Sequence, residues 1–138
     1  MKILVIDDVQ LIREWFLDVL EPLGHEVRLV ADAESALDQF HETRFDLAFF
    51  DHDLSGKMNG SQLASQILEH PKKYKRPRLV WVHSHNLNGA LNIEAKFKAA
   101  GIECWLEQYI HCIGYKQDFK NTVEALLEGK PIPSREFR

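Results

Sequence analysis

The chain has 138 residues, of which 45% are hydrophobic and 28% charged, and its formal net charge is −4. This length predicts one domain with a sizeable core, and the composition is that of an ordinary soluble globular protein. The net negative charge argues against general binding to the nucleic acid backbone. No apolar stretch approaches the roughly 20 residues of a membrane span.

Short apolar runs alternate with amphipathic segments along the chain. In chain order they predict strand Lys2–Ile6, helix Val9–Leu20, strand Glu26–Val30, a helix capped by Asp32, strand Phe45–Phe50, helix Ser61–Glu69, strand Arg78–Val82, helix Leu87–Ala100, strand Ile102–Leu106 and helix Lys116–Glu128. Residues 107–114 fit neither pattern. The alternation predicts an α/β three-layer sandwich with one parallel sheet between two helix layers. We expect one domain over residues 1–130 and a tail over 131–138.

Two further features bear on compartment and partners. Cys104 and Cys112 fit neither a metal spacing nor a disulfide framework, and no signal-peptide pattern follows Met1, so a cytoplasmic location is expected. The basic strip of residues 72–78 is most simply a solvated loop, although a local contact with nucleic acid there stays open.

Polar side chains follow three of the predicted strands at the point where each strand ends. These groups are Asp7-Asp8, then Asp51-His52-Asp53, and then His83-Ser84-His85-Asn86. The carboxyl ends of parallel strands are where ligands bind in open α/β sheets, and ionisable groups are costly to bury without partners. We therefore expect the three groups to meet in one pocket.

The acids in this expected pocket favour a metal. Neighbouring carboxylates repel one another, and a hard divalent cation such as Mg²⁺ relieves that repulsion with oxygen ligands. Because histidines stand beside the acids, Mn²⁺ or Zn²⁺ can compete with Mg²⁺ for such a site.

Asp7-Asp8 after the first strand and Asp51 after the third resemble the acidic pocket of response regulator receiver domains. The resemblance implies a flavodoxin-like sheet of order 2-1-3-4-5. Two strand ends depart from the receiver pattern. The fifth strand ends Trp105-Leu106-Glu107-Gln108 and lacks the receiver lysine, and the fourth ends in His83-Ser84-His85-Asn86 in place of Ser or Thr followed by a small residue. A further departure is Asp53, at a position where receivers use only the backbone carbonyl.

These departures resemble a divergent family, the cyclic-phosphate-processing receiver domains. The similarity rests on Asp51-His52-Asp53-Leu54, on Asn59-Gly60, and on His83-Ser84-His85-Asn86 with Asn88-Gly89-Ala90. It implies a metal-assisted phosphoesterase that processes a cyclic phosphate on a nucleotide or an RNA end. Its site residues here would be Asp7, Asp8, Asp51, His52, Asp53, His83, Ser84 and Asn86.

The chemistry expected of these residues falls into three parts. Asp7, Asp8, Asp51 and Asp53 are the candidate metal ligands. His83 and His52 are candidates for general acid and base beside Asp51, because imidazole titrates near neutral pH. Ser84 and Asn86, with backbone N–H groups at the start of the next helix, are expected to hold phosphate oxygens.

Structural readings of the same residues stay open. Asp7-Asp8 could cap the first helix, and Ser84 and Asn86 could cap the helix of residues 87–100. His52 could be a surface imidazole and His83 a hydrogen-bonded core histidine. If the chain stays extended, strand alternation puts Asp51 and Asp53 on one side and His52 on the other.

Two other functions compete with the phosphoesterase. One is a response regulator receiver that accepts a phosphoryl group on Asp51 for two-component signalling, and the other is a non-catalytic pseudo-receiver that only contacts proteins. The expected partners are a small phosphorylated ligand or cyclic-phosphate end and a protein, with neither membrane binding nor general DNA binding.

Overall fold

The computed structural model describes residues 1–107 and 116–132. Its elements are β1 (Lys2–Ile6), α1 (Gln10–Leu20) with a 3-10 turn at Glu21–Leu23, β2 (Glu26–Val30), α2 (Ala33–Glu42), β3 (Leu47–Phe50), α3 (Gly60–Glu69), β4 (Leu79–Val82), α4 (Leu87–Ala99), β5 (Glu103–Leu106) and α5 (Lys116–Glu128). Each predicted element is present, with bounds within two residues of those expected. Most of the unassigned stretch 107–114 and of the expected tail 131–138 lies outside the described residues.

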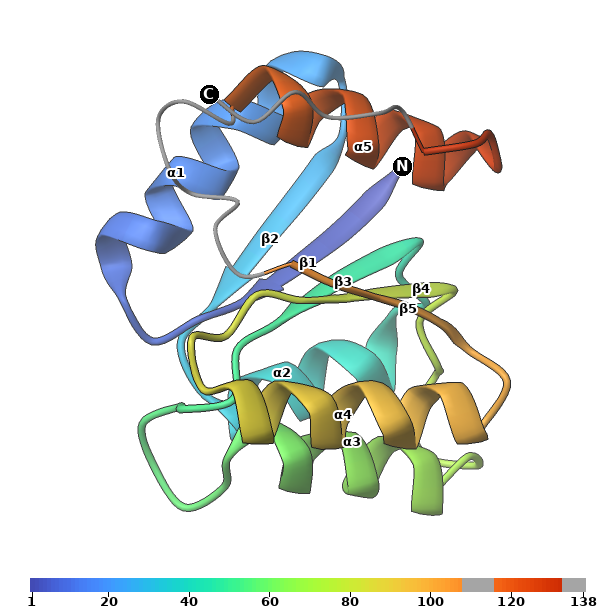
Figure 1. Ribbon diagram of the computed structural model, residues 1–138. Helices are drawn as coiled ribbons and strands as arrows, with labels where there is room; N and C mark the ends of the chain where they lie inside the picture. The colour runs from blue at the N-terminus through green and yellow to red at the C-terminus, as the bar shows by residue number, and fades with distance from the viewer. Residues whose placement is uncertain (108–115, 133–138) are drawn as a thin grey trace.

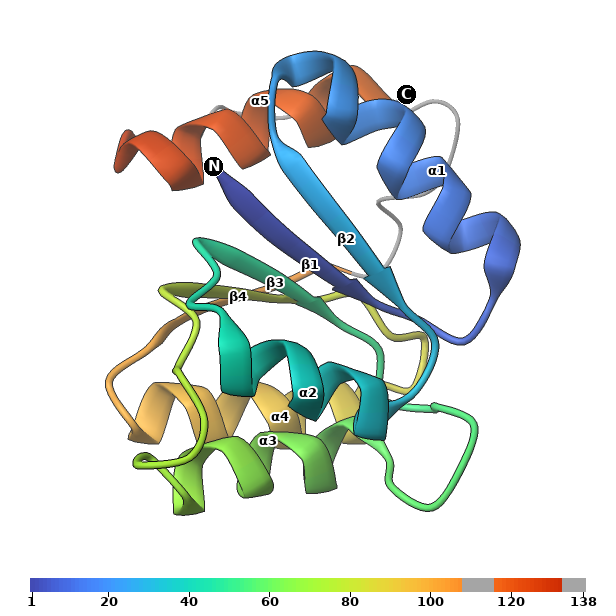
Figure 2. The same cartoon turned by 180° about the vertical axis from the view of Figure 1, so that it is seen from behind.

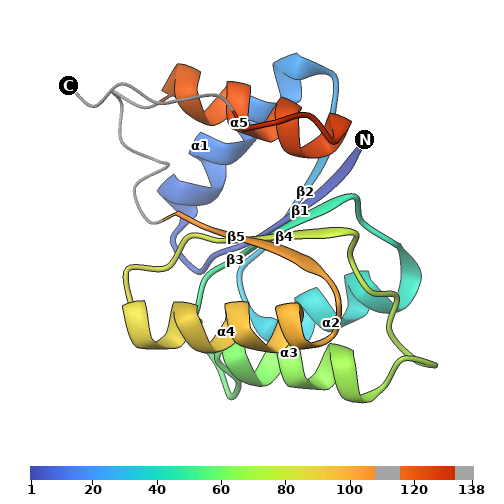
Figure 3. The ribbon, with the colours of Figure 1, turned by 45° about the vertical axis from the view of Figure 1, so that its right-hand side comes forward.

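The five strands form one parallel sheet in the order β2-β1-β3-β4-β5. Helices α1 and α5 cover one face, and α2, α3 and α4 cover the other (Figures 1, 2 and 3). The predicted α/β three-layer sandwich of order 2-1-3-4-5 is confirmed. The helices of the described residues include none long and apolar enough to cross a membrane.

Strand alternation divides the core into two layers. On β3, Phe49 faces α1 and α5, where its ring centroid lies 4.7 Å from that of Phe16. The next residue, Phe50, faces the opposite layer and lies 5.1 Å from the ring of Phe97 on α4. Because side chains alternate along a strand, this parity decides which layer receives the first two polar residues that follow β3.

Side chains also define the helix ends. The carboxylate of Asp32 accepts a hydrogen bond from the backbone N–H of Ser35 at 2.7 Å, so the predicted cap is confirmed, and this bond lowers the pKa of Asp32. In the basic strip, Lys75 Nζ donates to the carbonyl of Glu42, the last residue of α2. Basic residues of this strip therefore stabilise a helix carboxyl terminus, where the dipole favours positive charge.

The cysteine of β5 is part of the core. Cys104 is buried, as its strand position predicts, and burial raises the pKa of its thiol to about 12. Cys112 lies outside the described residues.

Candidate metal centre

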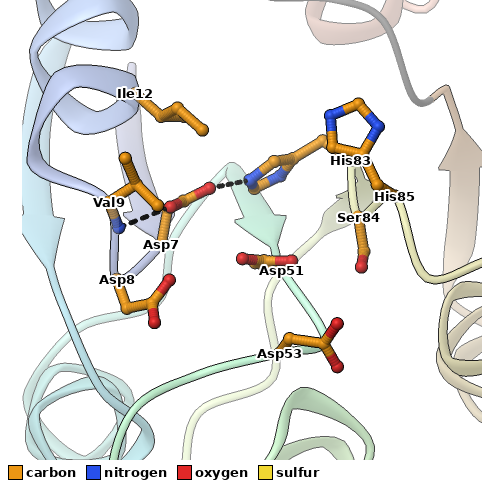
Figure 4. Close-up of a pocket in the computed structure, with 9 residues that line it drawn as sticks. All are labelled: Asp7, Asp8, Val9, Ile12, Asp51, Asp53, His83, Ser84 and His85. Carbon is orange, nitrogen blue, oxygen red and sulfur yellow. Dashed lines mark hydrogen bonds and ion pairs between the residues drawn. The ribbon is translucent and has the colours of Figure 1, made fainter.

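The predicted pocket lies at the carboxyl ends of β1, β3 and β4 (Figure 4). It has a volume of about 320 Å³. Its lining residues are Asp7, Asp8, Val9, Ile12, Asp51, Asp53, His83, Ser84 and His85. Six of the eight residues singled out from the sequence line this cavity, and His52 and Asn86 do not.

Strand parity and register place three of these residues side by side. The last paired positions of β1, β3 and β4 are adjacent, since Ile6 pairs with Phe50 and Phe50 with Val82. The next residue on each strand is Asp7, Asp51 or His83. Each comes two residues after a core residue of the α1/α5 layer, so all three side chains stand on that face of the sheet.

Three carboxylates come together at this edge. One oxygen from each of Asp7, Asp8 and Asp51 lies within 4.8 Å of the other two. Burial raises the pKa of Asp51, and the charge of Asp7 adds to this rise, while His83 and a hydrogen bond from the Ser84 side chain oppose it. A set of hard oxygen donors under mutual repulsion fits a divalent cation such as Mg²⁺.

Two of these acids are held by neighbours before any ligand binds. Asp7 is 1% exposed, its Oδ1 accepts the backbone N–H of Val9 at 2.8 Å, and its Oδ2 lies 2.8 Å from His83 Nε2. Asp8 Oδ2 accepts a hydrogen bond from Ser55 Oγ at 3.0 Å. The residue at the N-cap of α1 is Val9, which makes no side-chain cap, so a purely capping role for Asp7 and Asp8 does not hold.

His83 combines a buried ring with a contact to an acid. The side chain is 2% exposed, and its ring centroid lies 5.1 Å from that of Phe16 and 6.4 Å from that of Phe49. The ring reaches over the end of β3 to Asp7, as Figure 4 shows. The open alternative of a hydrogen-bonded core histidine therefore describes it well.

His52 lies on the opposite face of the sheet, because it follows Phe50 in the strand parity. Its ring packs on the first turn of α4, where a Cβ added to Gly89 would come 2.3 Å from His52 Cγ. Its Nδ1 lies 2.8 Å from Asp53 Oδ1. The structure thus separates the two imidazoles that were expected to act together.

Asp53 and Asn86 join His52 in a second polar cluster. Asp53 Oδ1 accepts a hydrogen bond from Asn86 Nδ2 at 3.1 Å, and Asn86 Oδ1 caps α4 by accepting the N–H of Gly89 at 2.9 Å. Hydrogen bonds from His52 and Asn86 lower the pKa of Asp53. Asp53 is exposed and lies outside the group of three close carboxylates, and the amide of Asn86 is engaged at both ends. Their predicted roles as metal and phosphate ligands stay predictions.

Sequence reasoning missed Ser55, which holds Asp8 from the loop after β3. The structure brings this loop to the site through an isolated bridge between Asp32 and Ser55. Nothing in the sequence marks that pairing, apart from the glycines and polar residues that identified a loop on the ligand side.

The end of β5 completes the row of strand ends with a further acid. Val82 pairs with Leu106, and the next residue, Glu107, donates its backbone N–H to the carbonyl of Val82 at 3.1 Å. Glu107 thus occupies the strand-end position in line with His83, where the receiver pattern has a lysine.

Comparisons with known proteins point to one family. The model of the response regulator receiver domain matches residues 3–100. A search of curated proteins gave no match.

Among solved structures, NtrX from Brucella abortus in complex with ADP has a TM-score of 0.70 and 26% identity, over 93% of this chain and 27% of NtrX. The receiver domain of NtrX alone has a TM-score of 0.69 and 27% identity, over 91% and 98% of the two chains. The response regulator TrrA from Thermotoga maritima, in complex with Mg²⁺-BeF, has a TM-score of 0.62 and 23% identity, over 91% and 97%. This chain therefore spans about a quarter of the NtrX chain in the complex with ADP.

The expectation of a metal-assisted phosphoesterase acting on a cyclic phosphate was wrong. The family model and the NtrX structures match a response regulator receiver domain, and none of these matches is to a cyclic-phosphate-processing domain. The physical reason lies in the imidazoles. His52 packs on α4 outside the cavity, and His83 Nε2 is engaged by Asp7, so the two rings do not flank a common substrate position.

Proposed function

The chain belongs to the response regulator receiver domain family, and on this premise we propose that it accepts a phosphoryl group on Asp51. The observation that carries the proposal is the cluster of Asp7, Asp8 and Asp51 in a cavity at the carboxyl end of the sheet. Receiver domains bind Mg²⁺ at such an acidic pocket. We assign Asp7, Asp8 and Asp51 as the residues that would hold the ion.

Asp51 is suited to be the nucleophile because it lies in the centre of the row of strand ends, between Asp7 and His83. One of its carboxylate oxygens attacks the phosphorus of the donor, and the bond from phosphorus to the leaving group breaks. The leaving group departs with the bonding electron pair, and Asp51 becomes an acyl phosphate. The donor is an acyl phosphate or a phosphorylated histidine of a protein partner.

The surrounding residues orient Asp51 and shield its charge. The Ser84 hydroxyl donates to Asp51, and this bond places a donor beside the phosphoryl oxygens once they arrive. When bound, Mg²⁺ supplies positive charge that offsets the repulsion between the carboxylates and the entering phosphoryl group. Because the Asp53 side chain is engaged by His52 and Asn86, we propose that its backbone carbonyl is the part that serves the ion.

Receiver domains commonly interact with protein partners, and the chain covers only part of the NtrX chain that it resembles. We therefore propose that phosphorylation of Asp51 changes the affinity of this domain for a protein partner.

The test is incubation with acetyl phosphate and Mg²⁺, followed by intact mass spectrometry. We expect the mass gain of one phosphoryl group, dependent on Mg²⁺ and absent from Asp51→Asn. Asp38→Asn is a matched control, because it removes an exposed carboxylate on α2 and should leave the gain unchanged. A chain that gains no mass, or an Asp51→Asn variant that gains as much as the parent, would overturn the proposal.

A further inference from the structure

The contact between His83 and Asp7 has no counterpart in the receiver pattern quoted above, in which Ser or Thr stands at the end of the fourth strand. It joins residues 76 positions apart, over the end of the strand that carries Asp51. We propose that His83 is a positioning residue for the metal centre, and that its Nε2–H fixes the carboxylate of Asp7 in the orientation that receives Mg²⁺. This inference rests on the proposed function, since it assumes that Asp7 is a ligand.

The direction of the hydrogen bond follows from the partners. A carboxylate oxygen only accepts, so the shared hydrogen is carried by His83 Nε2. Among the described residues, the other ring nitrogen, Nδ1, is buried and has no hydrogen-bond partner. The bond to Asp7 is therefore the polar contact that sets the ring's orientation, and the aromatic rings of Phe16 and Phe49 hold the ring in place.

Asp7 is anchored from two sides by this arrangement. Its Oδ1 accepts from the backbone of Val9, and its Oδ2 accepts from His83, both at 2.8 Å. Each carboxylate oxygen has two lone pairs, so one on each oxygen stays available for a cation. Asp8 and Asp51 are also held, by Ser55 and Ser84 respectively. The site is thus arranged before the ion arrives, which reduces the ordering that binding requires.

Residues that hydrogen-bond to a metal ligand have measurable effects on metal affinity. Removing a hydrogen-bond partner that orients a ligand typically costs about 10- to 100-fold in metal affinity. The opposite role for His83, competition with the cation, makes an equally specific prediction. If the imidazole stood in for the cation and competed for Asp7, its removal would strengthen Mg²⁺ binding. The two roles therefore predict changes of opposite sign.

The experiment is a calorimetric Mg²⁺ titration of the full chain with a matched pair of variants. His83→Met removes the N–H donor and fills the space of the ring with a flexible apolar side chain, and His83→Gln keeps a donor near the Nε2 position. We expect His83→Met to bind Mg²⁺ at least about tenfold more weakly than the parent, and His83→Gln to recover most of the loss. Equal or tighter binding by His83→Met would overturn the proposal.

A second measurement needs no variant and therefore no assumption about folding. Nitrogen-15 correlation spectra of the parent imidazoles report which ring nitrogen carries the hydrogen. We expect the Nε2–H form of His83 both without Mg²⁺ and at saturation, and loss of that form on saturation would contradict a positioning role. If the parent binds no Mg²⁺, the metal centre of the proposed function fails as well, whereas a failure confined to the His83 measurements leaves that function standing.

Discussion

Two polar clusters follow β3 on opposite faces of the sheet, and they begin at consecutive residues. Asp51 belongs to the pocket cluster, with Asp7 and His83 beside it, whereas His52 belongs to the α4 cluster, with Asn86. The exposed side chain of Asp53 lines the pocket but makes its hydrogen bonds with His52 and Asn86, so we count it with the α4 cluster. In the pocket cluster, burial and the charge of Asp7 raise the pKa of Asp51. In the α4 cluster, hydrogen bonds lower the pKa of Asp53. The carboxylates of the pocket cluster repel one another, and a bound cation would relieve that repulsion. The side chains of the α4 cluster hydrogen-bond to one another and cap the amino end of α4.

This difference suggests which histidine serves which purpose. Residue types alone made His52 and His83 equivalent candidates for acid–base work. Their surroundings separate them, because His52 packs on a helix backbone while His83 contacts a proposed metal ligand. The following predictions separate the two clusters further.

The largest effect on stability is expected from Gly89→Ala in the α4 cluster. The added Cβ would lie 2.3 Å from His52 Cγ, so the ring or the helix must shift. Overpacking of this kind typically costs about 1–3 kcal/mol. We therefore expect the free energy of unfolding, measured with urea, to fall by about 1–3 kcal/mol. Adding His52→Ala should recover part of the loss. A gain of about 1 kcal/mol, the usual result of replacing glycine by alanine inside a helix, would show that His52 does not pack there.

In the pocket cluster, Mg²⁺ should stabilise the parent and have much less effect on Asp51→Asn. A ligand that binds only the folded state adds about 1.4 kcal/mol for each tenfold rise in its concentration above Kd. Without Mg²⁺, Asp51→Asn should be the more stable protein at neutral pH, because it removes a carboxylate that burial and Asp7 disfavour. Thermal unfolding with and without Mg²⁺ measures both effects. Equal responses of the two proteins would show that Asp51 is not a ligand of the ion.

Asn86→Ala should lower stability by about 1 kcal/mol, the usual cost of losing an N-cap. Since Asn86 does not line the cavity, we expect the Mg²⁺ affinity to change less than about twofold. Asn86→Ser keeps a capping oxygen and serves as the control. A large drop in Mg²⁺ affinity with little change in stability would show that Asn86 belongs to the pocket cluster.

The smallest effects are two opposite pH dependences of stability. The folded-state pKa of Asp51 lies above its ordinary value of 3.8, so the folded protein binds the extra proton, and stability falls as pH rises from 3.8 through that raised pKa. The pKa of Asp53 lies below 3.8, so its contribution is present above 3.8 and is lost as pH falls through the lowered pKa. Unfolding curves of Asp51→Asn and Asp53→Asn, each compared with the parent across acid pH, should reveal the two trends. Trends of the same sign would contradict the comparison.

The sequence was sufficient to predict the sheet and the three close carboxylates. Apolar runs of strand length, separated by helical periodicity, fix a parallel sheet, and residues that follow adjacent parallel strands must meet at one edge. Alternation also placed His52 opposite Asp51, as the structure has it. The catalytic assignment of His52 needed a turn before His52 that would bring its ring to the side of Asp51, whereas the chain stays extended through His52 and the ring packs on α4.

The remaining features depend on contacts that no local pattern encodes. The chain turns directly after His52, where the N–H of Leu54 donates to the carbonyl of His52 at 3.1 Å. Parity therefore stops applying before Asp53, which joins His52 rather than the three acids. The contact of His83 with Asp7 depends on the choice of ring orientation between Phe16 and Phe49, and packing decides that choice across distant elements.

The most direct test of the central claim is to locate the phosphoryl group by peptide mass spectrometry after treatment with acetyl phosphate and Mg²⁺. We expect modification of Asp51 in the peptide that follows β3, and loss of that modification when Mg²⁺ is chelated. A phosphoryl group found on His52, His83 or a residue outside the pocket, with Asp51 unmodified, would contradict it.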